Sequence, residues 1–239
     1  MFDFHLHLAR FESSRALAKG LLDAGVNFNT IACEPWEWEK TLELMDEGQD
    51  AHYAFGIHPM VASKMTDRNF SQLEEILRAN PDTDVGECGL DKRFEGYEPA
   101  GTQEQVFKRQ VLLAQELNRP LHVHCVGDYS RILRILQNCT SNAKQHDRPV
   151  VLHRFGGDVS VVKSALKALG PQVLFSLHAD SFRKKSTVAA IQEIPAQQVR
   201  FETDADESFA EKFGNSPDEI IKQLEAVQNN YKAINPKNT

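Results

Sequence analysis

The chain has few cysteines and no long apolar run. Its four cysteines (Cys33, Cys88, Cys125 and Cys139) are scattered and form no CxxC pair, which argues against a zinc ribbon or a redox-active pair. No run of about 18 apolar residues occurs, so we expect no membrane span. The N-terminus also lacks the basic segment and apolar stretch of a secretion signal. We therefore expect a cytoplasmic protein with reduced cysteines that makes no contact with a membrane.

Positive charge is also in deficit. The 239 residues contain 27 Lys and Arg against 34 Asp and Glu, which gives a formal net charge of -7. Such a surface as a whole does not attract nucleic acid, so a phosphate-bearing substrate must be drawn by local positive charge or by bound metal. The length fits one domain, because α/β barrels often run to about 200–250 residues as a single unit.

What the chain does have is an alternating segment at its start, which reads MFDFHLHLAR over residues 1–10. Asp3, His5 and His7 alternate with apolar residues, and a period of two places them on one face of a strand. Two imidazoles two positions apart at the end of a strand can reach one metal ion. The pattern is weak by itself, and it also fits a short strand whose histidines are merely polar.

Strand-like and helix-like runs alternate along the whole chain. The strand-like runs are Phe2–Leu8, Val26–Ala32, His52–Ile57, Thr83–Cys88, Pro120–Cys125, Val150–His153, Val173–Leu177 and Val199–Thr203. The helix-like runs are Ser14–Ala24, Trp36–Glu47, Asn69–Ala79, Thr102–Leu117, Tyr129–Cys139, Val159–Leu169, Thr187–Glu193 and Pro217–Ala233. Eight such units predict an α/β protein, a single-domain (β/α)8 TIM barrel, regular or distorted, over residues 1–234. Residues 235–239 are expected to form a flexible C-terminal tail.

An open, doubly wound sheet is the alternative to the barrel. It would need fewer strands and usually a glycine-rich turn after the first of them. No such turn follows Leu8. The sequence therefore favours the barrel.

Side chains capable of metal binding recur at the carboxyl ends of the predicted strands. They are His5, His7, His58, Glu87, His124, His153 and Asp204. In a TIM barrel this end carries the active site. Six of these nitrogen and oxygen ligands, all but His58, would suit two divalent ions, with zinc, manganese and magnesium as candidates. Each histidine alone is more often structural, but their common placement favours a metal centre.

Six short motifs carry a family resemblance. They are DFHLHL (Asp3–Leu8), GIHP (Gly56–Pro59), GECGLD (Gly86–Asp91), HC (His124-Cys125), HRF (His153–Phe155) and ETD (Glu202–Asp204). In this order, over roughly residues 1–205, they resemble the TatD family of metal-dependent hydrolases, within the amidohydrolase superfamily. The resemblance implies a dinuclear barrel hydrolase that is a deoxyribonuclease, typically a 3′–5′ exonuclease.

The resemblance also implies roles for the predicted ligands. It makes His5, His7, Glu87, His124, His153 and Asp204 the metal ligands, with Glu87 bridging two ions. Such a carboxylate offsets the repulsion between two cations, which can activate a water molecule and stabilise charge on the phosphoryl oxygens. Asp204 can bind metal and also accept the proton of that water as a general base. Glu87 and Asp204 are therefore the predicted catalytic residues.

The chain departs from the family pattern at several positions. Val126 stands where the family usually has arginine, Arg154 where it has cysteine or serine, and Asp206-Glu207 where it has proline and tyrosine. These departures affect substrate choice more than metal binding. They keep two other functions open: a hydrolase of a small-molecule ester, amide or phosphoester, and a non-catalytic barrel that serves as a binding subunit.

Cationic side chains near the predicted mouth are candidates for substrate contact. Arg154 and His58 are predicted to contact the phosphate of DNA, presented as a single strand or a 3′ end, with Lys92 and Arg93 further out. The basic run Arg183–Lys185 could guide a phosphate backbone. A solvated charged segment is the simpler interpretation of that run.

Two further residues share a strand face with a predicted ligand. Glu202 has this relation to Asp204, and His122 has it to His124. Each could support a ligand imidazole from behind, as a carboxylate does when it accepts the second ring proton. An internal salt bridge for Glu202 and a packed core histidine for His122 are the alternatives.

Overall fold

The computed structural model describes residues 1–46, 51–140 and 148–235. The strands in these residues are β1 (Phe2–Leu6), β2 (Asn27–Ala32), β3 (His52–Phe55), β4 (Asp84–Asp91), β5 (Leu121–Val126), β6 (Val150–Leu152), β7 (Val173–Leu177) and β8 (Val199–Phe201). The helices are α1 (Ser14–Asp23), α2 (Pro35–Asp46), α3 (Asp67–Ala79), α4 (Thr102–Glu116), α5 (Tyr129–Thr140), α6 (Val159–Leu169), α7 (Lys185–Ile191), α8 (Glu207–Phe213) and α9 (Pro217–Ile234).

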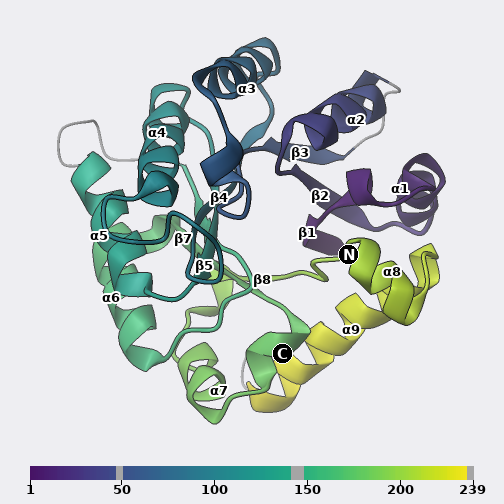
Figure 1. The fold of residues 1–239 in the computed structure, drawn as a ribbon. Coiled ribbons are helices and arrows are strands. Elements are labelled where there is room, and N and C mark those ends of the chain that lie inside the picture. Colours follow the sequence, from purple (N-terminus) through teal and green to yellow (C-terminus); the bar gives the residue numbers. More distant parts are fainter. Residues whose placement is uncertain (47–50, 141–147, 236–239) are drawn as a thin grey trace.

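The eight strands form one parallel sheet whose spatial order follows the chain from β1 to β8 in the described residues. The helices lie outside the ring of strands, as Figure 1 shows. Leu6 and Ala205 form an isolated parallel bridge between the two ends of the sheet, so the barrel is nearly closed. The predicted (β/α)8 barrel is confirmed, and this strand order rules out the doubly wound alternative.

Two elements at the mouth of the barrel differ from the prediction: β4 is longer, and α8 was not expected. β4 continues past Cys88 to Asp91, and Gly89, with φ +148°, lies so close to β5 that a Cβ there would clash with the carbonyl oxygen of His124. α8 is an additional short helix after the last strand. The Asp206 carboxylate begins it by accepting the backbone N–H groups of Ser208 and Phe209 at 2.9 and 3.0 Å.

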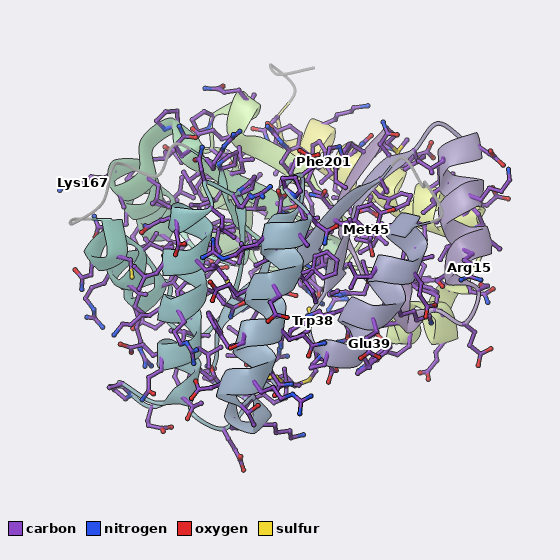
Figure 2. All side chains as sticks on the ribbon, turned by 90° about the horizontal axis from the view of Figure 1, so that it is seen from above. Arg15, Trp38, Glu39, Met45, Lys167 and Phe201 are labelled. Atoms are coloured by element: carbon purple, nitrogen blue, oxygen red, sulfur yellow. The ribbon has the colours of Figure 1, made fainter. Side chains whose placement is uncertain are left out.

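The helices pack on the barrel through the apolar faces that their periodicity predicts. α3 begins with a capping box between Thr66 and Asn69, and it buries a stripe that includes Leu73 and Leu77. Trp38 on α2 is fully buried, and its indole N–H donates to the carbonyl oxygen of Gly56 at 3.0 Å. Figure 2 labels Trp38 among the side chains that surround it.

Hydrogen bonds across the junction of β1 and β8 hold the first strand beside the segment that follows the last strand. The buried Asp3 carboxylate accepts the backbone N–H of Thr203 at 3.0 Å and its hydroxyl at 2.5 Å. Burial raises the pKa of Asp3 to about 7, although these hydrogen bonds oppose the shift. The backbone N–H of Asp204 donates to the carbonyl oxygen of His5 at 2.9 Å. The junction therefore fixes Asp204 beside the histidines of β1.

None of the described helices is both long enough and apolar enough to cross a membrane. The cytoplasmic location inferred from the sequence stays a prediction. At the C-terminus, Asn235 is buried at the end of α9, and its backbone N–H donates to Tyr231. The rest of the predicted tail, residues 236–239, lies outside the described residues.

Candidate metal centre

The six predicted ligands converge at the carboxyl ends of the strands. His5 lies on β1, Glu87 on β4 and His124 on β5. His7 and His153 directly follow β1 and β6, and Asp204 lies three residues after the end of β8. All five of the histidine and glutamate side chains are buried, and Asp204 is half-buried. The strand pattern thus carries six side chains capable of metal binding into one pocket.

Glu87 lies at the middle of this pocket, and its two oxygens face different histidines. Oε2 lies 3.3 Å from His5 Nε2 and 3.9 Å from His7 Nε2. Oε1 lies 2.5 Å from His124 Nδ1 and 3.4 Å from His153 Nε2. Burial alone would raise the pKa of Glu87, but the imidazoles of His153 and His124 lower it well below its usual range. Glu87 is therefore an ionised carboxylate placed between two pairs of imidazoles.

Asp204 completes the ring of oxygen and nitrogen atoms. Its Oδ1 lies 3.4 Å from His7 Nε2 and 3.8 Å from His153 Nε2, one histidine from each pair. Its Oδ2 accepts a hydrogen bond of 2.5 Å from Arg154. Burial raises and His153 lowers the pKa of Asp204, and the net shift is well below the usual range. One oxygen thus faces the histidines while the other faces a guanidinium.

Each of three imidazoles has one ring nitrogen engaged away from Glu87 or Asp204. His7 Nδ1 lies 3.1 Å from the carbonyl oxygen of Ile31. His124 Nε2 lies 3.0 Å from Asp91 Oδ2, and His153 Nδ1 lies 3.0 Å from Glu202 Oε1. Carbonyl and carboxylate oxygens only accept, so these contacts favour a proton on the outer nitrogen. The inner nitrogens face the carboxylates of Glu87 and Asp204. Burial lowers the pKa of these three imidazoles, but the neighbouring carboxylates raise the pKa above its usual range. A metal ion would take the place of the inner proton and bind the lone pair of that nitrogen.

The donor set fits metal ions. Both ring nitrogens of His5 are buried without a hydrogen bond, and burial lowers the pKa of His5 to about 4, which keeps the ring neutral. Two groups of three donors have ligand atoms within 4.8 Å of one another and share Glu87: His5 with His7, and His58 with His124. Buried imidazole and carboxylate donors in such groups suit zinc or manganese, and more open coordination suits magnesium.

The two predicted supporting residues differ in what they touch. Glu202 is fully buried, contacts His153 as described, and accepts the backbone N–H of Arg154 at 2.6 Å. His122 lies one layer deeper in the barrel, with Nε2 2.9 Å from Asp84 Oδ2 and its ring 6.0 Å from the ring of His5. Glu202 therefore reaches a predicted ligand directly, whereas His122 pairs with Asp84 beneath the pocket.

The four predicted substrate residues surround the pocket at different depths. His58 Nε2 lies 3.3 Å from His124 Nδ1, and burial lowers the pKa of His58 to about 3. Arg154 donates through Nη1 to Asp204 and through Nη2 to Asp180, each at 2.5 Å. The Arg93 guanidinium clamps the Asp91 carboxylate at 2.6–3.1 Å. Its side chain is still 60% exposed, so it can offer positive charge to solvent.

A sequence model of the TatD related DNase family matches residues 2–237. The chain belongs to this family. A 3′-5′ ssDNA/RNA exonuclease TatD of Edwardsiella piscicida is 31% identical over 63% of the chain and 56% of its own length. A human protein named deoxyribonuclease TATDN3 is 27% identical over 85% of the chain and 77% of its own length. The uncharacterized metal-dependent hydrolase YabD of Bacillus subtilis is 26% identical over 69% of the chain.

The fold is shared with solved structures of TatD proteins. The TatD homologue YJJV of Escherichia coli superposes with a TM-score of 0.74 at 21% identity and covers 98% of this chain and 97% of its own. A TatD family hydrolase of Entamoeba histolytica gives a TM-score of 0.75 at 15% identity, covering 100% of this chain and 95% of its own. The chain matches less than two thirds of the length of the Edwardsiella and Bacillus relatives.

In this TatD-family chain a large cavity opens beside the metal-binding pocket. It has a volume of about 820 Å³ and lies between the loops that follow β5, β6 and β7; we call it the loop cavity. Its walls include Lys92, Tyr129, Arg154 and Lys184. Val126, which stands where the family usually has arginine, also lines it. Two of the predicted cationic residues, Lys92 and Arg154, therefore share one hollow.

Sequence reasoning missed three residues at the pocket. Asp91 lies four residues after Glu87, so alternation places both on one face of β4. The predicted strand ended at Cys88 and therefore did not include Asp91. Asp180 lies in a short 3-10 helix, Ala179–Phe182, after β7, where no periodicity marks it. Cys33 follows β2, and its buried sulfur lies 3.9 Å from Glu87 Oε2 and 4.0 Å from His7 Nδ1. Burial raises the pKa of Cys33 to about 12, so the thiol stays protonated.

Proposed function

We propose that this chain is a metal-dependent deoxyribonuclease that hydrolyses phosphodiester bonds of DNA and removes nucleotides from the 3′ end of a single strand. The observation that carries the proposal is the placement of Glu87, whose two oxygens face two separate pairs of imidazoles. A carboxylate so placed can bridge two cations, the arrangement used to clamp a phosphodiester. The names of the Edwardsiella and human relatives support the choice of substrate and polarity.

Two divalent ions, zinc, manganese or magnesium, are the cofactors in this proposal. His5 and His7 would hold one with Glu87 Oε2, and His124 and His153 would hold the other with Glu87 Oε1. Asp204, whose Oδ1 lies near one histidine of each pair, would bind beside them. When bound, the ions would supply Lewis-acid activation of a water molecule and of the phosphoryl oxygens.

Side chains of the chain would perform the remaining steps. Asp204 is the proposed general base, because its carboxylate is ionised and directed into the pocket. Glu87 contributes by holding the two donor sets together. Arg154 and His58 would bind the oxygens of the cleaved phosphate, since a guanidinium fork matches them. Lys92 and Arg93 would contact the strand further out.

Residues 1–234 would act as one hydrolase unit, since the pocket draws ligands from both β1 and the segment after β8. The six donors span residues 5–204, so a part of the chain that stops before Asp204 or starts after His5 lacks at least one of them. The donors are also buried within one hydrophobic core that runs from Leu6 to Tyr231. The proposed function therefore needs the whole barrel.

A nuclease assay with a metal series tests the proposal. Metal-free protein receives zinc, manganese or magnesium and single-stranded oligonucleotides labelled at the 3′ or 5′ end. We expect metal-dependent release of nucleotides from the 3′ end. Asp204→Asn keeps the shape of the side chain but not its basicity, so its activity should fall by roughly 10²–10⁴, while the fold and at least one metal ion are retained.

The matched control is Asp82→Asn, the same change at an exposed position before the amino end of β4. This variant should keep wild-type activity. Cleavage by Asp204→Asn at the wild-type rate would overturn the general-base role, leaving His58 as the next candidate. Hydrolysis of small esters or amides by a protein that leaves every oligonucleotide intact would overturn the nuclease proposal, and a protein that binds no metal would favour a non-catalytic barrel.

A further inference from the structure

We propose that the loop cavity holds the backbone phosphates of the part of the nucleic acid strand that is not being cleaved. The inference rests on the proposed nuclease function and adds to it where the rest of the substrate lies. It follows from the position of the cavity, the charges in its walls and its size relative to a second cavity beside the pocket.

Arg154 connects the loop cavity with the metal-binding pocket. This residue lines the cavity and at the same time donates to Asp204 at the metal-binding pocket. One guanidinium group therefore separates the pocket from the cavity. In this inference, a strand whose cleaved phosphate lies at Asp204 passes Arg154 and enters the loop cavity.

The acidic residues in the walls already have partners. Asp128 accepts the backbone N–H of Arg131 at the start of α5, and Asp158 accepts two backbone N–H groups at the start of α6. Asp180 lies between Arg154 and Arg183, with Arg183 Nε 2.9 Å from its Oδ1. Within the described residues, these carboxylates are all engaged in holding the loops.

The lysines in the walls are not engaged in this way. Neither Lys92 nor Lys184 forms a side-chain hydrogen bond or ion pair in the part of the chain that the structure describes, and both side chains are exposed. The cavity walls carry four cationic side chains, Lys92, Arg154, Arg183 and Lys184, against three carboxylates, Asp128, Asp158 and Asp180. In a chain of net charge -7, this small positive balance and two ammonium groups without an ion pair among the described residues make the hollow a local anion site. Phosphates along a flexible strand are anions that separate cations in one hollow can bind.

A second cavity beside the pocket is the other possible site for the uncleaved part of the strand. It has a volume of about 310 Å³ and is lined by Asp204, Phe209 and Phe213 as well as Arg154. The larger cavity, of about 820 Å³, has room for more than one nucleotide and two lysines without an ion pair in the described part of the chain. The smaller cavity has one such lysine, Lys212, whose ammonium lies over the Phe213 ring. A polyanion extending away from the pocket is therefore assigned to the loop cavity.

Hydrogen bonds between loops hold the wall of the loop cavity in one arrangement. The Tyr129 hydroxyl accepts the backbone N–H of Gly156 at 3.1 Å, which ties the loop after β5 to the loop after β6. The buried Thr187 hydroxyl donates to the carbonyl oxygen of Gly156 at 3.2 Å and ties in the start of α7. A preformed cavity reduces the ordering cost of binding a flexible strand.

Binding of a labelled single-stranded oligonucleotide in EDTA tests the inference without catalysis. Lys184→Glu places a negative charge in the loop cavity, and Lys167→Glu makes the same change on the outer face of α6, where Figure 2 shows Lys167 at the edge of the molecule. We expect Lys184→Glu to raise Kd at least about tenfold and to reduce the slope of log Kd against log salt by roughly 0.7–1. Lys167→Glu should match the wild type.

A second pair of variants blocks the cavity without changing charge. Ser186→Trp fills space at the exposed start of α7 in the cavity wall, and Ser164→Trp adds the same side chain on the exposed face of α6. We expect weaker binding only for Ser186→Trp, with unchanged melting temperatures for both. Equal Kd and salt slopes within each pair would overturn the inference, even if the wild type cleaves DNA. A wild type that binds and cleaves no oligonucleotide would overturn the proposed function as well.

Discussion

Arg154 and Asp204 follow different strands, β6 and β8, yet Nη1 of the arginine lies 2.5 Å from Oδ2 of the aspartate. Both residues have a left-handed backbone, with φ of 45° and 52°. This conformation costs a residue other than glycine about 1–3 kcal/mol and occurs mainly where surrounding contacts impose it. Here those contacts are the Glu202 carboxylate, which accepts the Arg154 N–H, and the His5 carbonyl oxygen, which accepts the Asp204 N–H.

Arg154→Ala is expected to weaken substrate binding more than metal binding. Because the guanidinium would bind phosphate by charged hydrogen bonds, KM for an oligonucleotide should rise about 10- to 100-fold, with metal content retained. Arg154→Lys should not restore it, since an ammonium lacks the fork that faces both Asp204 and Asp180. Steady-state kinetics with Arg134→Ala, an exposed arginine of α5, as the control measures this. If KM and kcat are unchanged, Arg154 makes only a structural ion pair.

Glu202→Gln should lower metal affinity. The carboxylate lies 3.0 Å from His153 Nδ1 and would hold the ring proton there when the other nitrogen binds metal, so its neutral replacement should cost about 10- to 100-fold in affinity. Titration of metal-free protein measures the change. Asp84→Asn is the control, because Asp84 contacts His122 beneath the pocket and should not affect metal binding. A similar loss in both variants would mean that His122 matters as much as Glu202.

Gly89→Ala should destabilise the barrel at the pocket. A Cβ at Gly89 would lie 2.0 Å from the carbonyl oxygen of His124, and φ there is +148°. Clash and backbone strain together should lower the free energy of unfolding by about 3 kcal/mol or more. Gly25→Ala separates the two causes, since Gly25 has φ +72° with open space around it, and should cost only about 1–2 kcal/mol. Equal losses in urea unfolding would exclude the clash.

The ion pair of Glu104 and Arg131 should contribute stability that is lost in acid. Burial raises the pKa of Glu104, but hydrogen bonds from Lys108 and Arg131 outweigh it and lower the pKa to about 2. The folded state then binds the Glu104 proton less readily than the unfolded chain, whose ordinary value is 4.5, so the contribution is complete above pH 4.5 and disappears towards pH 2. Water screens the exposed side of the pair, so Glu104→Gln should cost about 1–2 kcal/mol at neutral pH.

The measurement is the difference in free energy of unfolding between wild type and Glu104→Gln at a series of pH values. The difference should shrink as the pH falls from 4.5 to 2. Glu95→Gln, at an exposed position in the loop between β4 and α4, should show no such trend. A difference that stays constant with pH would indicate that the ionised form of Glu104 is not what stabilises the fold.

Short-range patterns in the sequence were sufficient for the fold and for the ligand candidates. Alternation around His5 and His7, and the recurrence of helix and strand periods, are properties of neighbouring residues. Because parallel strands in a barrel present their carboxyl ends on one side, the order of the motifs also implied that Glu87 and Asp204 lie at the same end as these histidines. These inferences need only local geometry and one rule of topology.

Only the tertiary structure decided which atoms meet. That Glu87 turns one oxygen to each pair of imidazoles depends on the register of β4 against β5 and on closure of β1 against β8, which join residues far apart in the sequence. The same holds for Asp180, whose contact with Arg154 joins the loops after β7 and β6. The hydrophobic period of a segment indicates the face of the strand or helix on which a side chain lies. The contact that this side chain makes across the barrel depends on packing among segments far apart in the sequence, which no local pattern encodes.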